Sequence, residues 1–275
     1  MPTIESLYAW AAPAFLDESP VDHTWVTSYD NRTQNYPDIE AVIAAEQDCW
    51  FCWGGYCAKG GTSDDASGFL CLRDGDLVLS RCLARPNADC GSSFPARGTI
   101  FTYGVDGVCH QLANQVLYST GGGGGQPVTV APARGYMLSC AIYGTYGLQR
   151  AAWKGRIEAC STTIASLYTR RRAKGEMMMS ATLPAAPHDE FEEHVNKVLG
   201  PGAEAAKLLL LRGEFQKKAA MQAHEARTPP ADELNERNQR FFDEAAKILP
   251  PKDYVRVFGV KPGARIKLVR ADIMK

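Results

Sequence analysis

The 275-residue chain has no long apolar run: no stretch approaches the roughly 20 consecutive apolar residues that a membrane-spanning helix needs. The segment Met1–Ser6 also lacks the basic residues followed by an apolar stretch that mark a secretory signal. We therefore expect a cytoplasmic protein without a membrane span, in which most of the nine cysteines are reduced thiols.

An excess of charge of one sign is lacking as well. Lys and Arg number 30, Asp and Glu number 31, and the formal net charge is −1. Nothing in this balance indicates a nucleic acid or an anionic membrane as partner, and we expect neither. An internal repeat of roughly 20–50 residues is also missing, which argues against a solenoid.

The second part of the chain lacks cysteine and tryptophan, because all nine Cys and all five Trp lie before residue 161. The stiff segment Leu183–Pro187, which holds two prolines, follows this change in composition. We predict a domain boundary near residue 184, with an α+β catalytic domain over residues 1–183 and a mainly helical domain over residues 184–275.

The first region mixes strand and helix signals. Its patterns predict strands at 23–29, 99–103, 127–131 and 136–146, a hairpin of 68–72 with 76–83, and helices at 39–47 and 153–172. Short strands and a hairpin among helices are typical of an α+β fold with a largely antiparallel sheet.

The second region carries three apolar stripes at helical spacing. They are Phe191, Val195 and Leu199; Leu208, Leu211 and Phe215; and Leu234, Phe241, Ala245, Ile248 and Leu249. Two strand-like runs, 254–258 and 266–269, close the chain. Helical hairpins of this kind commonly dock or dimerise, so we expect a protein partner or a homodimer to use these helices.

Cys109 is the main candidate for chemistry. It follows the turn Gly104–Gly107 and opens a helix whose apolar face includes Leu112 and Val116. Unpaired N–H groups and the positive end of the helix dipole lower the pKa of a thiol at such a position and favour the reactive thiolate. The alternative is that Cys109 only fills the core, as buried free cysteines often do.

A thiolate nucleophile needs a base, and the chain offers two histidines in the first region. His110 is adjacent to Cys109, but neighbouring helix positions point about 100° apart. His23 opens a predicted strand, and a strand beside the helix of Cys109 can bring an imidazole within hydrogen-bond reach. We therefore expect His23 to be the partner of Cys109.

The two segments that carry these residues are Asp22-His23-Thr-Trp-Val26 and Gly107-Val-Cys109-His-Gln-Leu112. Their order, a strand histidine before a helix-opening cysteine, resembles the circularly permuted branch of the papain-like NlpC/P60 superfamily, which includes lecithin-retinol acyltransferase-like enzymes. The resemblance covers at most residues 20–120. The acyltransferase branch favours Asn-Cys-Glu-His-Phe where this chain has Val-Cys-His-Gln-Leu.

The resemblance implies a cysteine hydrolase or acyl transferase that acts on an amide or ester of a small-molecule or peptide substrate. Cys109 would form a thioester, and His23 would act first as base and then as acid. The backbone N–H of Cys109 would help to hold the oxyanion. A third polar group should orient His23; we assign this role to Asp38, with Asp30 and Asn35 as alternatives.

A second constellation is the run Cys49-Trp-Phe-Cys52-Trp-Gly-Gly-Tyr-Cys57. The Cys-x2-Cys step has metal-ligand spacing, so Cys49, Cys52 and Cys57 are candidate ligands of a structural zinc. The fourth ligand would be Cys71, Cys82 or Cys90. The aromatic residues between the cysteines are also typical of a segment that only packs in the core. A redox-active thiol pair is a third interpretation. The alternative function is accordingly a non-enzymatic metal-binding or partner-binding protein without catalytic chemistry.

Overall fold

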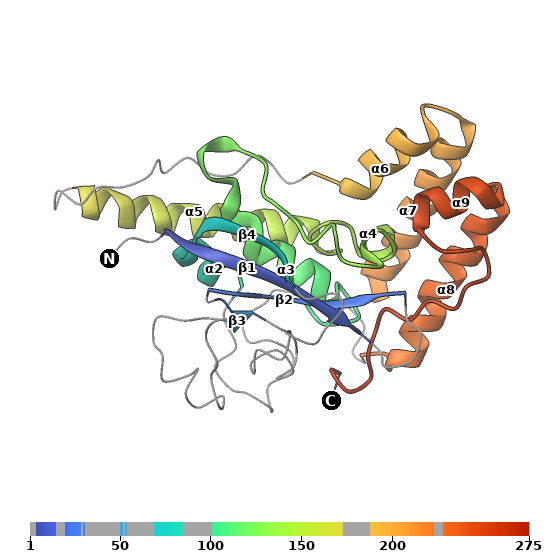
Figure 1. The fold of residues 1–275 in the computed structure, drawn as a ribbon, viewed down its shortest axis with the longest axis horizontal. Coiled ribbons are helices and arrows are strands. Elements are labelled where there is room, and N and C mark those ends of the chain that lie inside the picture. The colour runs from blue at the N-terminus through green and yellow to red at the C-terminus, as the bar shows by residue number, and fades with distance from the viewer. Residues whose placement is uncertain are drawn as a thin grey trace.

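The structure is a computed structural model that describes residues 4–14, 20–28, 30, 50–51, 53, 69–84, 101–172, 188–222 and 228–274 (Figure 1). A sheet and the helices on it form one part, and a group of helices near the C-terminus forms the other. This arrangement is an α+β fold with a mainly helical C-terminal region, as the sequence predicted.

Within the described residues the sheet has four strands in the order β3-β2-β1-β4, and the pairings between them are antiparallel. The strands are β1 (Ile4–Pro13), β2 (Asp22–Thr27), β3 (Trp50–Phe51) and β4 (Phe69–Asp76). The long strand β1 lies in the centre and pairs on both sides, although the sequence analysis did not predict it. β2 confirms the strand predicted at 23–29, and its bounds are set slightly earlier.

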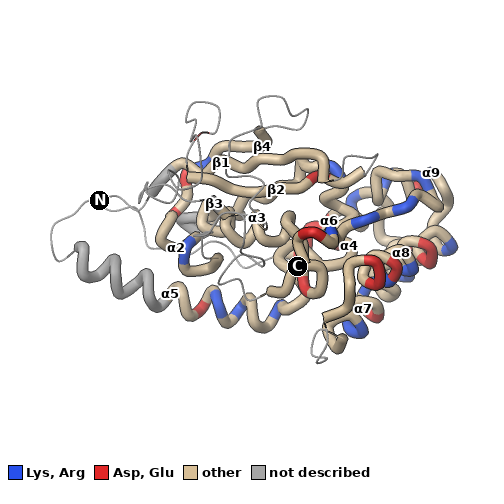
Figure 2. The backbone as a smooth tube through the Cα atoms, turned by 90° about the horizontal axis from the view of Figure 1, so that it is seen from below, with Lys and Arg blue, Asp and Glu red and all other residues tan. Residues whose placement is uncertain are grey.

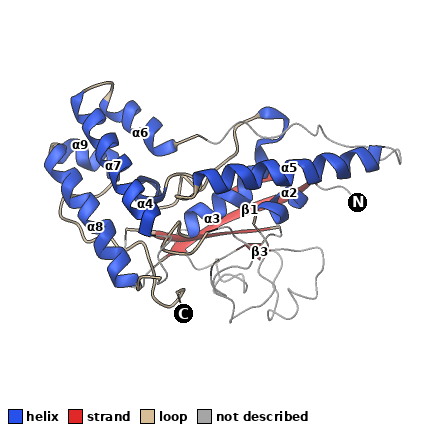
Figure 3. Ribbon diagram, turned by 180° about the vertical axis from the view of Figure 1, so that it is seen from behind, coloured by secondary structure: helices blue, strands red, loops and turns tan. Residues whose placement is uncertain are grey.

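One face of the sheet is covered by helices (Figures 2 and 3). They are α2 (Leu77–Leu83) and α3 (Cys109–Leu117), with the 3₁₀ helix η2 (Tyr118–Gly124) against β4. Helix α5 (Arg150–Arg172) lies beyond α2 as a further layer, and α4 (Tyr136–Tyr143) packs between α3 and the C-terminal helices. Because strand side chains alternate, Leu7 and Val26 face this layer and share a core with Leu112 of α3. Trp10 and Trp25, which are paired in the register, lie on the opposite face.

Three segments predicted as strands are helices in the structure. Residues 76–83 contain α2, because the carboxylate of Asp76 accepts hydrogen bonds from the N–H groups of Val78 and Leu79 and caps a helix there. Residues 136–146 contain α4, which is buried on nearly all sides and so has no amphipathic period. Residues 254–258 belong to α9 (Pro251–Phe258), which begins with a proline in the first helical turn.

Three further strand predictions also differ from the structure. The predicted strand at 266–269 is irregular and forms no strand. The described part of 99–103 forms no strand and contributes only the isolated bridge between Tyr103 and Gly107. Residues 127–131 are extended but pair with no strand among the described residues. The helix predicted at 39–47 lies outside the described residues.

The C-terminal region confirms the three predicted stripes as helices. They lie on α6 (Glu190–Leu199), α7 (Ala203–Gln222) and α8 (Ala231–Ile248). On α7 the apolar side chains of Leu210 and Met221 are 65 % and 73 % exposed. A partner or second copy that uses these helices stays a prediction.

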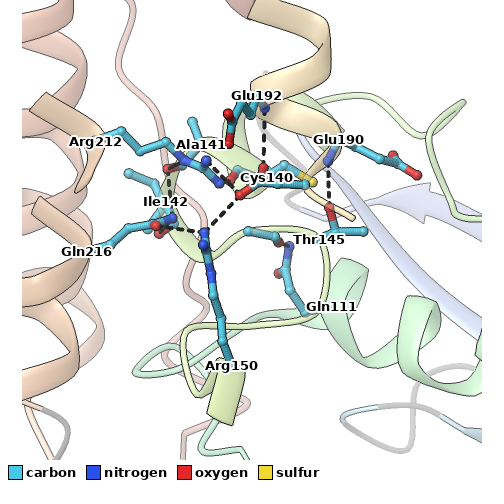
Figure 4. A network of polar contacts seen from close by, with 12 residues as sticks. Gln111, Cys140, Ala141, Ile142, Thr145, Arg150, Glu190, Glu192, Arg212 and Gln216 are labelled. Atoms are coloured by element: carbon cyan, nitrogen blue, oxygen red, sulfur yellow. Dashed lines mark hydrogen bonds and ion pairs between the residues drawn. The ribbon is translucent and has the colours of Figure 1, made fainter. Parts of the chain in front are cut away.

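Arg212 of α7 connects the two regions (Figure 4). It is 4 % exposed, and its guanidinium donates to the carbonyl oxygens of Ala141 and Cys140 at the end of α4, at 3.0 and 2.9 Å. It also pairs with Asp189 at 2.8 Å. One apolar core runs through both regions, so the composition change near residue 184 separates two architectures that pack together.

The described cysteines include one disulfide that the sequence did not predict. Cys82 of α2 and Cys160 of α5 form this bond, while Cys71, Cys109 and Cys140 are free thiols. The bond also removes Cys82 from the possible zinc ligands. Among the described helices, none combines the length and the apolar character that crossing a membrane requires.

Candidate functional site

Cys109 is the first residue of α3, as the sequence predicted. The side-chain oxygen of Gln111 accepts the N–H of Val108 at 3.1 Å, and this bond fixes the entry to the helix. The carbonyl of Val108 accepts the N–H groups of Gln111 and Leu112. By helix geometry the N–H groups of Cys109 and His110 have no acceptor within α3. The thiol therefore lies beside two backbone N–H groups that can still donate a hydrogen bond.

The thiol of Cys109 is 5 % exposed and meets the start of β2. Its Sγ lies 3.9 Å from the carbonyl oxygen of Asp22, the residue that precedes His23. The described residues of β3 pair with Val26 and Thr27, at the other end of β2. The edge of β2 at Asp22 is therefore occupied by the first turn of α3.

A salt bridge holds the start of β2 in place. The carboxylate of Asp22 accepts the Nε–H and the backbone N–H of Arg134 at 2.8 and 2.9 Å. In return the N–H of Asp22 donates to the carbonyl of Arg134 at 3.0 Å. Because three contacts join Asp22 to the loop before α4, the carbonyl that faces Cys109 has a fixed position.

His23 follows Asp22 directly and is 1 % exposed. Strand alternation puts its imidazole on the face of Trp25, and the two rings stack with centroids 5.8 Å apart. The structure thus brings the backbone of His23 next to Cys109, while the core side chains of α3 pack on the opposite face. Any contact of the imidazole with Sγ must pass around the edge of β2.

His110 is fully buried between α3 and α4. Its Nδ1 lies 2.7 Å from Oγ of Ser139, which in turn donates to the carbonyl of Tyr136 at 2.8 Å. Burial lowers the pKa of His110 to about 4; the carboxylate of Asp22 opposes this shift, and the nearby imidazole of His23 adds to it. His110 is therefore a neutral core residue between Ser139 of α4 and the backbone of Asp22, the residue whose carbonyl also meets the thiol of Cys109.

Three residues near the site were not predicted from the sequence: Tyr103, Arg270 and Asp272. The hydroxyl of Tyr103 accepts the backbone N–H of Arg270 at 3.2 Å. Burial raises the pKa of Tyr103 well above its usual value, and the nearby thiol of Cys109 adds to the rise. The segment after α9 thus reaches the neighbourhood of Cys109, and no local pattern at residues 270–272 could have predicted this.

Arg270 and Asp272 form an ion pair, and the predicted site residues contribute to the pKa shifts of both groups. The pKa of Arg270 is raised. Burial alone would lower it, but the hydrogen bond to Asp272 outweighs burial, and the thiol of Cys109 also raises it. Burial alone raises the pKa of Asp272, yet Arg270 lowers it more strongly, with a smaller contribution from His23. Both charges therefore stay in place at neutral pH.

Several other predicted residues cannot be placed in the site. Asp38, Asn35, Cys49, Cys52, Cys57 and Cys90 lie outside the described residues, so the orienting role of Asp38 and the zinc site stay predictions. Asp30 lies beyond the end of β2. Within the described ranges, no three His, Cys, Asp or Glu side chains come together as a metal site.

Comparison with known proteins adds no relative. No protein-family model matches the chain, and no curated protein or solved structure matches it. The case for a function therefore depends on the residues and their geometry.

Proposed function

We propose that the protein is a cysteine-dependent hydrolase or acyl transferase whose nucleophile is Cys109. One observation carries the proposal: the thiol opens α3 and contacts the Asp22 carbonyl, immediately before His23 on β2. A helix N-terminus favours the thiolate, and the neighbouring strand supplies the only histidine of the first region that does not face α4.

In the first half-reaction the imidazole of His23 turns around the edge of β2 to reach the thiol and accepts its proton, and the sulfur of Cys109 attacks the acyl carbon of an amide or ester. The carbon–sulfur bond forms, the bond to the amine or alcohol breaks, and the leaving group takes the proton from His23. In the second half-reaction water or an acceptor loses a proton to His23 and attacks the thioester, which releases the thiol again.

Two features of the site would assist these steps. The N–H groups of Cys109 and His110 can donate to the oxygen of the tetrahedral intermediate, because neither has an acceptor within α3. Asp272 lies near His23 and remains ionised through its pair with Arg270, so it can stabilise the imidazolium. Asp272 joins Asp38 as a candidate for the orienting residue.

The site is closed, because Cys109 and His23 are only 5 % and 1 % exposed. A substrate must therefore displace a covering segment. The chain after α9 is the candidate for this movement, since the thiol of Cys109 contributes to raising the pKa of Arg270 and Arg270 is joined to Tyr103 by one hydrogen bond.

Acyl transfer from an activated ester tests the proposal. After incubation with p-nitrophenyl acetate and acid quenching, mass spectrometry should find one acetyl group on Cys109. Cys109→Ser should abolish this labelling, and His23→Gln should slow it at least about a hundredfold, as is usual for loss of a general base. Cys140→Ser, which removes a buried thiol of α4, is the matched control and should react normally.

Acetyl groups spread over several cysteines, or a Cys109→Ser variant that reacts like the wild type, would contradict the proposal. A His23→Gln variant with an unchanged rate would leave Cys109 reactive but remove His23 from the mechanism.

A further inference from the structure

A cavity of about 370 Å³ lies where α5 begins, beside the segment that leads into α6. Its lining residues come from the loop after α4, from the first turn of α5 and from the residues before α6: Thr145, Tyr146, Gly147, Arg150, Trp153, Lys154, His188 and Asp189. This volume falls within the range of small-molecule sites. The acyl-transfer proposal uses none of these residues.

One wall of the cavity is aromatic. The rings of Tyr146 and Trp153 stack with centroids 5.6 Å apart and an angle of 16° between their planes. Tyr118 packs edge-on against both rings from behind. The two stacked rings form the apolar wall against which a flat ligand would lie.

Three buried polar atoms of the lining residues have no hydrogen-bond partner among the residues that the structure describes. They are the hydroxyl of Tyr146, Nε1 of Trp153 and Nδ1 of His188. Tyr146 and Trp153 are only 5 % and 2 % exposed. A buried donor without an acceptor is costly, and such groups usually mark a strained or functional place. A ligand with acceptor oxygens would satisfy them after small side-chain shifts.

Positive charge lies at the mouth of this cavity. Arg150 and Lys154 are four residues apart on α5 and project to the same side, together with Trp153. The ammonium of Lys154 has no ion-pair or hydrogen-bond partner within the described part of the chain. The acid of the lining, Asp189, is already held at 2.8 Å by Arg150 and at 2.8 Å by Arg212.

The other charged groups near the cavity already have partners, so Lys154 is its unpaired cation among the described residues. His188 lies 3.6 Å from Glu190 and 3.9 Å from Glu193, so these carboxylates face the histidine. Arg150 also donates to the side-chain oxygen of Gln216, as Figure 4 shows. We infer that the cavity binds a small organic anion: a flat apolar body against Trp153 and Tyr146, with a carboxylate on Lys154.

Calorimetric titration of the full chain with 2-naphthoate tests this inference. The matched probes 2-naphthylmethanol and 2-naphthylmethylammonium have the same rings but no charge or the opposite charge. We expect 2-naphthoate to bind at least about tenfold more tightly than either probe. Equal affinity for the three, or no heat from 2-naphthoate, overturns the assignment.

Two variants locate the binding. Lys154→Ala should weaken 2-naphthoate about tenfold and leave the neutral alcohol unchanged, whereas Lys197→Ala on α6 should change neither. Tyr146→Phe keeps the ring and should weaken the anion severalfold. Lys154→Ala with unaltered affinity would place the anion elsewhere. Neither variant touches Cys109, so the outcome is independent of the acyl-transfer proposal.

Discussion

Helix α3, which carries Cys109, and helix α8 of the C-terminal region are buried in different ways. All nine residues of α3 are buried and none is charged, whereas α8 buries one apolar face and exposes charged side chains on the other (Figure 2). On α3 the amides of Gln111, Asn114 and Gln115 donate to the carbonyls of residues 144, 145 and 146 at 2.9, 2.8 and 3.1 Å.

This difference concerns what surrounds each helix. α8 combines non-directional apolar burial on one face with directional hydrogen bonds from Asn235 and Asn238, and its other face stays in water. α3 is enclosed on all sides, and its directional hydrogen bonds satisfy the backbone of a loop that would otherwise carry buried carbonyls. Complete burial together with directional bonds holds Cys109 at a defined place.

The largest effect is expected where the two regions meet. Arg212→Met removes the buried guanidinium donor from the α4 carbonyls of Cys140 and Ala141, which retain the N–H of Gly144 at 2.9 Å and the amide of Gln216 at 3.4 Å. It also removes one of two cations from Asp189. We expect the free energy of unfolding to fall by about 3–5 kcal/mol, the usual cost of breaking a buried charged network. Urea unfolding measures it, with the exposed Arg240→Met as control. A loss no greater than that of the control would show that the regions are held together by apolar contact alone.

The next effect is the pH dependence due to His110. Its pKa is about 4 in the folded protein against an ordinary value near 6.5, so the fold is fully stable above that value. As the pH falls from about 6.5 to 4, the unfolded chain gains a proton that the folded chain does not, and up to about 3 kcal/mol is lost. His110→Gln should flatten this part of the curve of unfolding free energy against pH. Parallel curves for both proteins would contradict the assignment.

A smaller effect compares two asparagines, one from each region. Asn114 of α3 is fully buried and bonds to Thr145, Tyr136 and the N–H of Val130. Asn235 of α8 makes a similar set of bonds to residues 268 and 269 but is only partly buried. We expect Asn114→Ala to cost about 2–3 kcal/mol and Asn235→Ala about 1 kcal/mol in thermal unfolding. Equal losses would remove the distinction between the helices.

The same contrast explains what the sequence could predict. The stripe of Leu234, Phe241 and Ala245 predicts α8 because water covers its other face and leaves a helical period. In α4, Leu138, Ile142 and nearly all of their neighbours are buried. The sequence therefore shows no helical alternation of apolar and polar residues, and the apolar run resembles a buried strand. Local turn and cap signals were enough to place Cys109 at the start of its helix.

The surroundings of the candidate site could not be predicted in full. His23 was expected on a strand beside the cysteine helix, and β2 does carry it there. Arg270 and Asp272 reach the site from the other end of the chain, through tertiary packing that leaves no trace in local spacing. The disulfide of Cys82 and Cys160 was missed for the same reason.

Alkylation by iodoacetamide at about pH 6, resolved by mass spectrometry for each cysteine, tests the central claim that Cys109 is the nucleophile. Cys71 is the internal comparison, because it is more accessible than the buried Cys109, while burial raises its pKa and Arg73 only partly offsets this. We predict that Cys109 is alkylated before Cys71 and that His23→Ala slows the alkylation of Cys109 but not that of Cys71. Faster labelling of Cys71, with Cys109 protected until the protein unfolds, would show that Cys109 is a core residue and would contradict the account.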